Sequence, residues 1–338
     1  MSMKVFTSVA ALAFACALGA ADAADTTKKK IALSNNYAGN SWRQAMLKSW
    51  DKVTKEAVAK GVIAQAQAFT TAENQGTEQA AQVQNLILQG YDAIVINAAS
   101  PTALNGAVKQ ACEAGIVVVT FDGIVTEPCA YRIAVDFKKL GAMQIDYLAS
   151  RGVKGNLLEI RGLAGVLVDD EIHAGMEAAA KARPEFKIVG SVHGNWTQTV
   201  AQKEVAGILP TLPEVVAIVT QGGDGYGAAQ AFKAAGRPVP VIFMGNREDE
   251  LAWWKQQKDA NGYETMSASV APGSSTFAFW IAQMVLSGAA VPKDMMLPIT
   301  VVTQKTLEDD LKRTDAGGVT NVDYSQADVL DFVAKLKR

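Results

Sequence analysis

The chain has 338 residues, of which 20% are charged, and its net charge is −2. This balance excludes the basic footprint of a nucleic-acid-binding protein, and the length predicts two domains of about 150 residues each. Two histidines and three cysteines without metal-ligand spacing indicate no metal site, and we expect no cofactor.

The N-terminus carries the features of a secretory signal. Lys4 precedes an uncharged apolar run at 5–21, and Ala21-Asp22-Ala23 matches a signal-peptidase site. Small and hydroxylated residues dilute the run, which favours a removable signal over an uncleaved anchor. Lipid attachment at Cys16 is an alternative, but Phe14 fits that motif poorly. We therefore expect removal of residues 1–23 and a soluble, periplasmic mature chain.

After the signal, short apolar runs alternate with amphipathic stretches. Several runs are continuously apolar, as expected for parallel strands that are buried on both faces. The predicted strands are 30–34, 62–69, 93–97, 117–121, 156–160, 187–193, 217–220, 241–244 and 264–270. The periodicity predicts helices at 42–60, behind a cap at Asn40 or Ser41, and at 77–89. The pattern indicates an α/β protein with two doubly wound parallel-sheet lobes, the first at 29–126 and the second from 127 onward.

Polar and aromatic side chains follow the predicted strands. Ligands of open α/β sheets bind beyond the carboxyl ends of the strands, so these residues are candidates for a binding site. Amides and carboxylates pair with vicinal hydroxyls, and aromatic faces pack against the apolar face of a sugar. For each residue alone, a cap, a turn or a core position is the alternative. The candidates are Tyr37, Asn40, Trp42, Arg43, Asn97, Asp122, Trp196, Gln221, Asp224 and Asn246, which Arg247 follows.

Two patterns could point to an enzyme instead. The cluster Asp169-Asp170-Glu171 could supply paired carboxylates for glycoside chemistry, although the same acids complement the start of a helix. The Gly-rich turn at 221–227 is a near miss for a dinucleotide fingerprint, because its third glycine is out of register. An exported carbohydrate-acting enzyme therefore remains the alternative function.

Cys112 and Cys129 are the two cysteines of the mature chain. An even number in an oxidising compartment predicts a disulfide, and two buried thiols are the alternative.

These segments together resemble the type I periplasmic sugar-binding proteins of ABC importers, in the ribose- and galactose-binding branch. The first strand and Asn40-Ser-Trp-Arg43 are similar to that family's first loop, where Trp42 fits and Arg43 departs. In the family, the residues at the positions of Asn97 and Asp122 contact sugar hydroxyls. Trp196 stands at the place of a stacking aromatic. Gln221 and Gly222 fall at an Asn-Asp pair of the family, whose role Asp224 would take over, and Asn246 falls near a binding aspartate.

The resemblance implies two lobes joined by three hinge crossings, near 122–136, near 244–248 and around Pro298. It further implies that 271–299 returns to the first lobe, that the second lobe ends at 270, and that 300–338 is a C-terminal extension. The implied function is a monomeric, non-enzymatic carrier of a monosaccharide or sugar alcohol. Its implied partner is an ABC permease in the inner membrane, and a chemoreceptor is a further possible partner.

Overall fold

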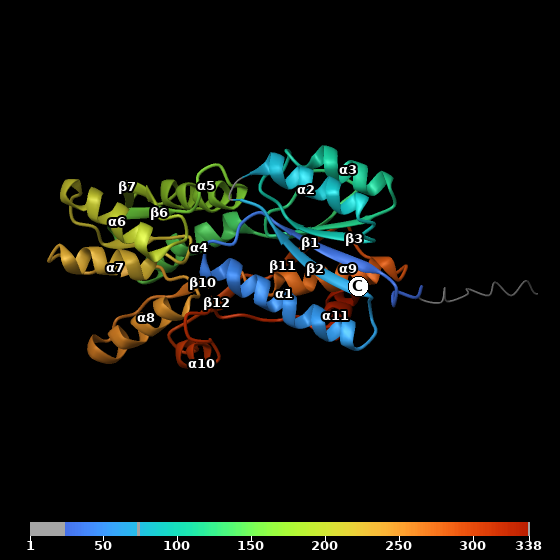
Figure 1. The fold of residues 1–338 in the computed structure, drawn as a ribbon. Coiled ribbons are helices and arrows are strands. Elements are labelled where there is room, and N and C mark those ends of the chain that lie inside the picture. Colours follow the sequence, from blue (N-terminus) through green and yellow to red (C-terminus); the bar gives the residue numbers. More distant parts are fainter. Residues whose placement is uncertain (1–23, 73–74, 337–338) are drawn as a thin grey trace, which may run out of the picture.

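The computed structural model describes residues 24–72 and 75–336 and places them in two α/β lobes that lie side by side (Figure 1). Each lobe contains a parallel sheet between helices, as the alternation of apolar runs predicts. The expected signal peptide, residues 1–23, lies outside the described residues. None of the described helices has both the length and the apolar composition to cross a bilayer.

The first lobe is built on a parallel sheet with six strands in the described part of the chain. In spatial order, the strands are β11 (Asp294–Leu297), β5 (Tyr131–Val135), β4 (Val117–Phe121), β3 (Ala93–Asn97), β1 (Lys30–Asn35) and β2 (Gln65–Thr70). One face packs on α1 (Ser41–Ala59) and α9 (Ser274–Leu286), and the other on α2 (Gly76–Leu88) and α3 (Asn105–Glu113). Alternate residues of β3, such as Val95 and Ile94, enter opposite cores, so the whole strand is buried.

The second lobe repeats this plan. Its parallel sheet has the order β7 (Phe186–His193), β6 (Gly155–Arg161), β8 (Ala217–Val219) and β9 (Val241–Ile242). The helices are α4 (Phe137–Ser150), α5 (Leu167–Lys181), α6 (Gln198–Ile208), α7 (Gly225–Ala234) and α8 (Glu248–Asn261), with a short 3-10 turn at Leu209–Thr211. A bridge between Met244 and Ser267 adds β10 (Ser267–Ser269), which pairs antiparallel with β12 (Thr300–Val302). The second sheet thus continues beyond β9.

The first lobe ends later than the sequence predicts. The expected boundary at 126/127 is wrong because β5 pairs in parallel with β4 and β11, which makes it a strand of the first sheet. A bidentate ion pair between Arg132 and Asp294 also fixes β5 to β11. Since β11 belongs to this sheet and α9 covers it, the stretch 271–299 does return to the first lobe.

The connections between the lobes differ in part from the prediction. The chain passes from β5 to α4 at Asp136, from β10 to α9 at 270–273, and from β11 to β12 at 298–299. The prediction of a crossing at 244–248 is wrong, because Met244 bridges to Ser267 and the chain stays in the second lobe.

The tail 300–338 is likewise not a separate extension. β12 and α10 (Leu307–Lys312) pack in the second lobe, where Val302 and Leu307 contact Trp254, whereas α11 (Gln326–Leu336) packs on α9 of the first. The tail therefore adds a further passage between the lobes.

A disulfide joins Cys112 at the end of α3 to Cys129 in the loop before β5, with the Cα atoms 6.4 Å apart. It closes a short loop beside the core of the first lobe, where both cysteines contact buried apolar residues. The disulfide therefore stabilises this lobe, and its cysteines do not line the cavity between the lobes.

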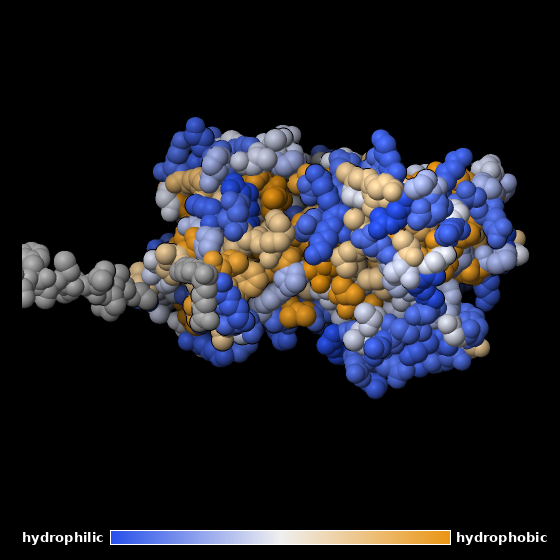
Figure 2. Space-filling model, turned by 180° about the vertical axis from the view of Figure 1, so that it is seen from behind, coloured by the Kyte–Doolittle hydropathy of each residue, from blue (hydrophilic) through white to orange (hydrophobic). Residues whose placement is uncertain are grey.

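The projecting part of the second lobe that holds α8 and α10 is covered by hydrophilic side chains (Figure 2). Ion pairs such as Lys258 with Glu308 at 3.3 Å lie in this region. Exposed pairs of this kind contribute little to stability.

Candidate functional site

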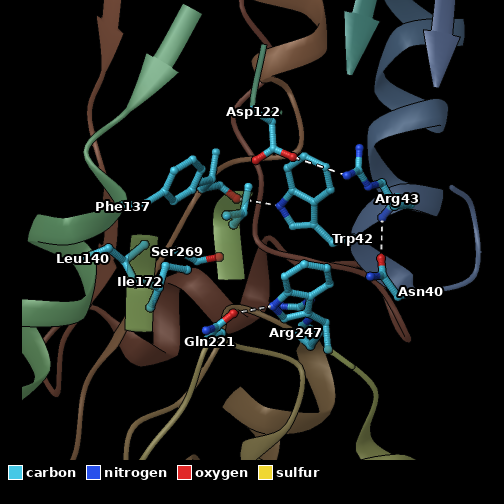
Figure 3. A pocket seen from close by; sticks show the side chains of 13 residues that line it. Asn40, Trp42, Arg43, Asp122, Phe137, Leu140, Ile172, Gln221, Arg247 and Ser269 are labelled. Atoms are coloured by element: carbon cyan, nitrogen blue, oxygen red, sulfur yellow. Dashed lines mark hydrogen bonds and ion pairs between the residues drawn. The ribbon is translucent and has the colours of Figure 1, made fainter. Parts of the chain in front are cut away.

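A cavity lies between the two lobes, and both contribute to its walls (Figure 3). The cavity has a volume of about 60 Å³, which is room for a few water molecules. The first lobe contributes Asn40, Trp42, Arg43 and Asp122, and the second lobe with its connection contributes Phe137, Leu140, Val168, Ile172, Trp196, Gln221, Arg247, Ser269 and Val270. Both walls combine polar and apolar groups.

The N-terminus of α1 places two of these residues. Asn40 caps the helix, since its side chain accepts a hydrogen bond from the backbone N–H of Arg43 at 2.8 Å. The indole Nε1 of Trp42 donates to the carbonyl of Val270 at 2.7 Å, in the connection between β10 and α9. The edge of the indole is therefore bonded to the connection while the side chain lines the cavity.

Asp122 follows β4 and faces Arg43. Its carboxylate lies 3.5 Å from the guanidinium of Arg43 and accepts a hydrogen bond from Asn97 Nδ2 at 3.0 Å. Burial raises the pKa of Asp122, while Arg43 and Asn97 oppose this shift; burial also lowers the pKa of Arg43. Asp122 has a φ of +58°, a left-handed conformation that few residues other than glycine adopt. The backbone here is held in an uncommon conformation that presents a buried carboxylate to the cavity.

A network of hydrogen bonds holds Gln221 and Trp196 in the second lobe. Gln221 Nε2 donates to Asp169 Oδ1 at 2.8 Å, and its Oε1 accepts from Trp196 Nε1 at 3.2 Å. Asn195 and Trp196 both have positive φ values, +55° and +54°. The ring of Trp196 packs over Gly162, where a Cβ would come within 2.2 Å of it. The loop thus positions an aromatic side chain at the cavity.

The acidic cluster is occupied by other contacts. Asp169 is fully buried and accepts hydrogen bonds from Arg161 at 2.6 Å and Gly162 N at 2.9 Å as well as from Gln221. Asp170 pairs with the same Arg161 at 3.0 Å. Burial raises the pKa of Glu171, which Lys138 opposes. The three acids do not line the cavity, so they do not form a carboxylate pair across it.

Six of the predicted residues line the cavity, namely Asn40, Trp42, Arg43, Asp122, Trp196 and Gln221. The other four lie outside its lining. Asn97 supports Asp122 from behind, and the ring of Tyr37 packs over Gly39. Asp224 is buried at the start of α7, and Asn246 Nδ2 donates to the carbonyl of Thr320 at 3.0 Å.

Sequence reasoning missed the remaining lining residues. Phe137 and Leu140 lie at the start of α4, directly after β5, a strand that the sequence did not reveal. Val168 and Ile172 are apolar positions of α5 that resemble ordinary core residues. Arg247 does follow a strand in the sequence, but its neighbour Asn246 was chosen instead.

The fold and the cavity define a two-lobed solute-binding protein in which the ligand is enclosed between domains. Residues 31–290 match the model of the periplasmic binding protein domain. The chain belongs to that family.

Individual relatives agree with this assignment. The chain is 27% identical over 281 residues to the ribose import binding protein of Bacillus subtilis, covering 81% of this chain and 87% of the relative. It is 29% identical over 188 residues to a xylitol-binding protein of Mycolicibacterium smegmatis, covering 54% of each. The crystal structure of an ABC transporter solute-binding protein from Thermobispora bispora has a TM-score of 0.86 at 35% identity and covers 92% of this chain and 96% of that one.

Proposed function

We propose that this protein is the solute-binding component of an ABC importer, which captures a small polyhydroxylated ligand of the monosaccharide or sugar-alcohol class and delivers it to a membrane permease. The observation that carries the proposal is a cavity with walls from both lobes. A ligand that contacts both walls favours the closed form by its differential affinity, and a permease can recognise that form. The relatives that bind ribose and xylitol support this ligand class.

The residues suit such a ligand. Asp122 and Arg43 would bind hydroxyls on the first lobe, with Asn40 beside them, while Trp42 and Trp196 would cover the apolar face of the carbon skeleton. Asn97 would orient Asp122 rather than contact the ligand, because it lies behind the carboxylate. Tyr37, Asp224 and Asn246 would support the residues of the site without contacting the ligand, because they do not line the cavity.

The alternative is an exported carbohydrate-acting enzyme that uses Asp169, Asp170 and Glu171. The hydrogen bonds and ion pairs of Asp169 and Asp170 oppose this role, and so does their position outside the cavity lining. We propose that the chain is not an enzyme. Loss of a glycoside-hydrolysing activity in Asp170→Ala, with ligand binding by Asp122→Asn unchanged, would establish the alternative.

A thermal-shift screen of the mature chain against pentoses, hexoses and polyols tests the proposed function. A ligand at a hundredfold excess over its dissociation constant adds about 2.7 kcal/mol to the free energy of unfolding. Small-angle scattering with the best ligand should then show a smaller radius of gyration. An unchanged melting temperature across the whole panel would refute the proposal, and unchanged scattering at saturation would indicate a rigid pocket.

We also propose that the protein is exported to the periplasm and acts as a monomer. Its proposed partner is the permease, and a chemoreceptor is a second proposed partner that would recognise the closed form. Intact-mass measurement on the periplasmic fraction should give a chain that begins at residue 24. A product that still carries Met1, or a lipid at Cys16, would contradict a soluble periplasmic carrier.

A further inference from the structure

Arg247 is a buried cation on the wall of the cavity. It lies between β9 and α8, is 5% exposed, and lines the cavity together with Gln221 (Figure 3). Its guanidinium packs over Gly222 and Gly223, which have φ values of +91° and +80°. A Cβ on Gly223 would lie 2.7 Å from Arg247 Cζ, so the two glycines leave the space that this side chain occupies.

In the described part of the chain the guanidinium of Arg247 forms no close ion pair, although its charge acts on Asp224 and Asp249. Its Nε is buried without a hydrogen-bond partner, and no described carboxylate forms an ion pair with it within 4.0 Å. The other arginines near the cavity differ, because Arg43 pairs with Asp122 and Arg161 pairs with Asp169. Burying a cation without a counter-ion raises the free energy of the folded protein, so an anionic partner next to Arg247 would stabilise it.

The nearby acids do not replace that partner. Glu250 is engaged by the backbone N–H groups of Gly223 and Gly225. Burial, and then the charge of Glu250, raise the pKa of Asp224 well above its usual range, while the charge of Arg247 opposes the shift. Among the lining residues, Arg43 and Asp122 offset one another, which leaves Arg247 as an excess positive charge.

We infer that the cavity takes a sugar acid, a ligand that carries a carboxylate beside its hydroxyls, and that Arg247 is the counter-ion of this carboxylate. The inference rests on the proposed solute-binding function and narrows its ligand class. A guanidinium fork matches a carboxylate through two parallel hydrogen bonds. The hydroxyls would then face Asp122, Arg43 and Asn40 on the opposite lobe, so that the ligand spans the cavity.

Calorimetry on the mature wild-type chain tests this with matched pairs: D-ribose and D-ribonate, xylitol and D-xylonate, and D-galactose and D-galacturonate. We expect the acid of at least one pair to bind at least tenfold more tightly than its neutral partner. If the neutral member binds as well as or better than the acid in every pair, the inference is overturned and the solute-binding function stands. If none of the six binds, the inference is overturned too, whereas the proposed function falls only if the full sugar and polyol panel also fails.

Variants assign the effect to Arg247. Arg247→Gln should weaken binding of the acid at least tenfold more than it weakens binding of the neutral partner, while Arg247→Lys, which keeps the charge, should recover part of the difference. Arg183→Gln is the control, because Arg183 pairs with Asp146 beyond the C-terminal end of α5, away from the cavity. Equal losses for acid and neutral ligands in Arg247→Gln would contradict the assignment. If Arg247→Gln lowers the melting temperature of the protein, the test rests on the affinities of Arg247→Lys instead.

Discussion

In the first lobe, the charged groups of the cavity are matched within the protein, whereas in the second lobe Arg247 has no counter-ion among the described residues. Asp122 is contacted by both Arg43 and Asn97, and Arg43 lies at the capped start of α1. The first wall thus carries its own charge pairing, and on the sugar-acid inference a ligand carboxylate would complete the second. Substitutions in the first wall should therefore reduce both stability and affinity, and those in the second should act chiefly on affinity.

The largest effect is expected from Asp122→Asn. Asparagine tolerates the left-handed backbone at this position better than alanine, so the substitution isolates the charge. Each lost charge-assisted hydrogen bond is worth about 1.5–3 kcal/mol, so losing two should weaken binding of the best ligand by roughly a hundredfold or more. Arg43 also loses its counter-charge, so the unliganded protein should melt earlier. Calorimetry and thermal melting would show both, and unchanged affinity would remove Asp122 from the site.

The disulfide should affect the stability of the first lobe without changing the cavity. Replacing Cys112 and Cys129 by serine should lower the free energy of unfolding by about 3 kcal/mol, because the unfolded chain loses a constraint. Ligand affinity should stay within twofold. Denaturant unfolding measures the first quantity and calorimetry the second. Two reactive thiols in the denatured, unreduced wild type would show that the bridge does not form.

Trp196→Ala tests the second wall. The indole lines the cavity and donates to Gln221, so its removal should weaken ligand binding about tenfold through lost contact area. The melting temperature of the unliganded protein should fall less than in Asp122→Asn. Trp253→Ala is the matched control and should leave affinity unchanged, because Trp253 on α8 forms a half-buried aromatic pair with Tyr263 and does not line the cavity. A larger loss of stability than of affinity in Trp196→Ala would break the proposed contrast between the walls.

Much of the fold follows from the sequence because parallel strands buried on both faces form unmistakable apolar runs, as at β3 and β4. The strand β5 and the edge strand β11 beside it are only partly buried, so their apolar pattern is weak, and the predicted boundary after residue 126 falls too early. Polar residues at strand ends were accessible to the same reasoning, which found Asp122 and Gln221. The apolar residues of the wall could not be predicted in this way, because Leu140 and Ile172 have the helical spacing of any core residue. The sequence also does not show that Arg247, and not Asn246, enters the cavity. The tail causes this, because the carbonyl of Thr320 accepts a hydrogen bond from Asn246.

The smallest effect concerns Asp224, the buried acid behind the second wall. Its carboxylate is fully buried, and burial together with Glu250 raises its pKa well above the usual value of 3.8, which Arg247 and the backbone N–H of Thr197 oppose. The folded state therefore binds this proton more tightly than the unfolded state, so the residue destabilises the protein as the pH rises from its unfolded pKa through its raised folded pKa. Asp224→Asn should melt at a higher temperature than the wild type at pH 8, with the difference shrinking toward pH 4. Asp331→Asn serves as the control and should show a much smaller change, because the Asp331 side chain on α11 is exposed. A stabilisation that does not depend on pH would show that packing, and not charge, sets the cost of this residue.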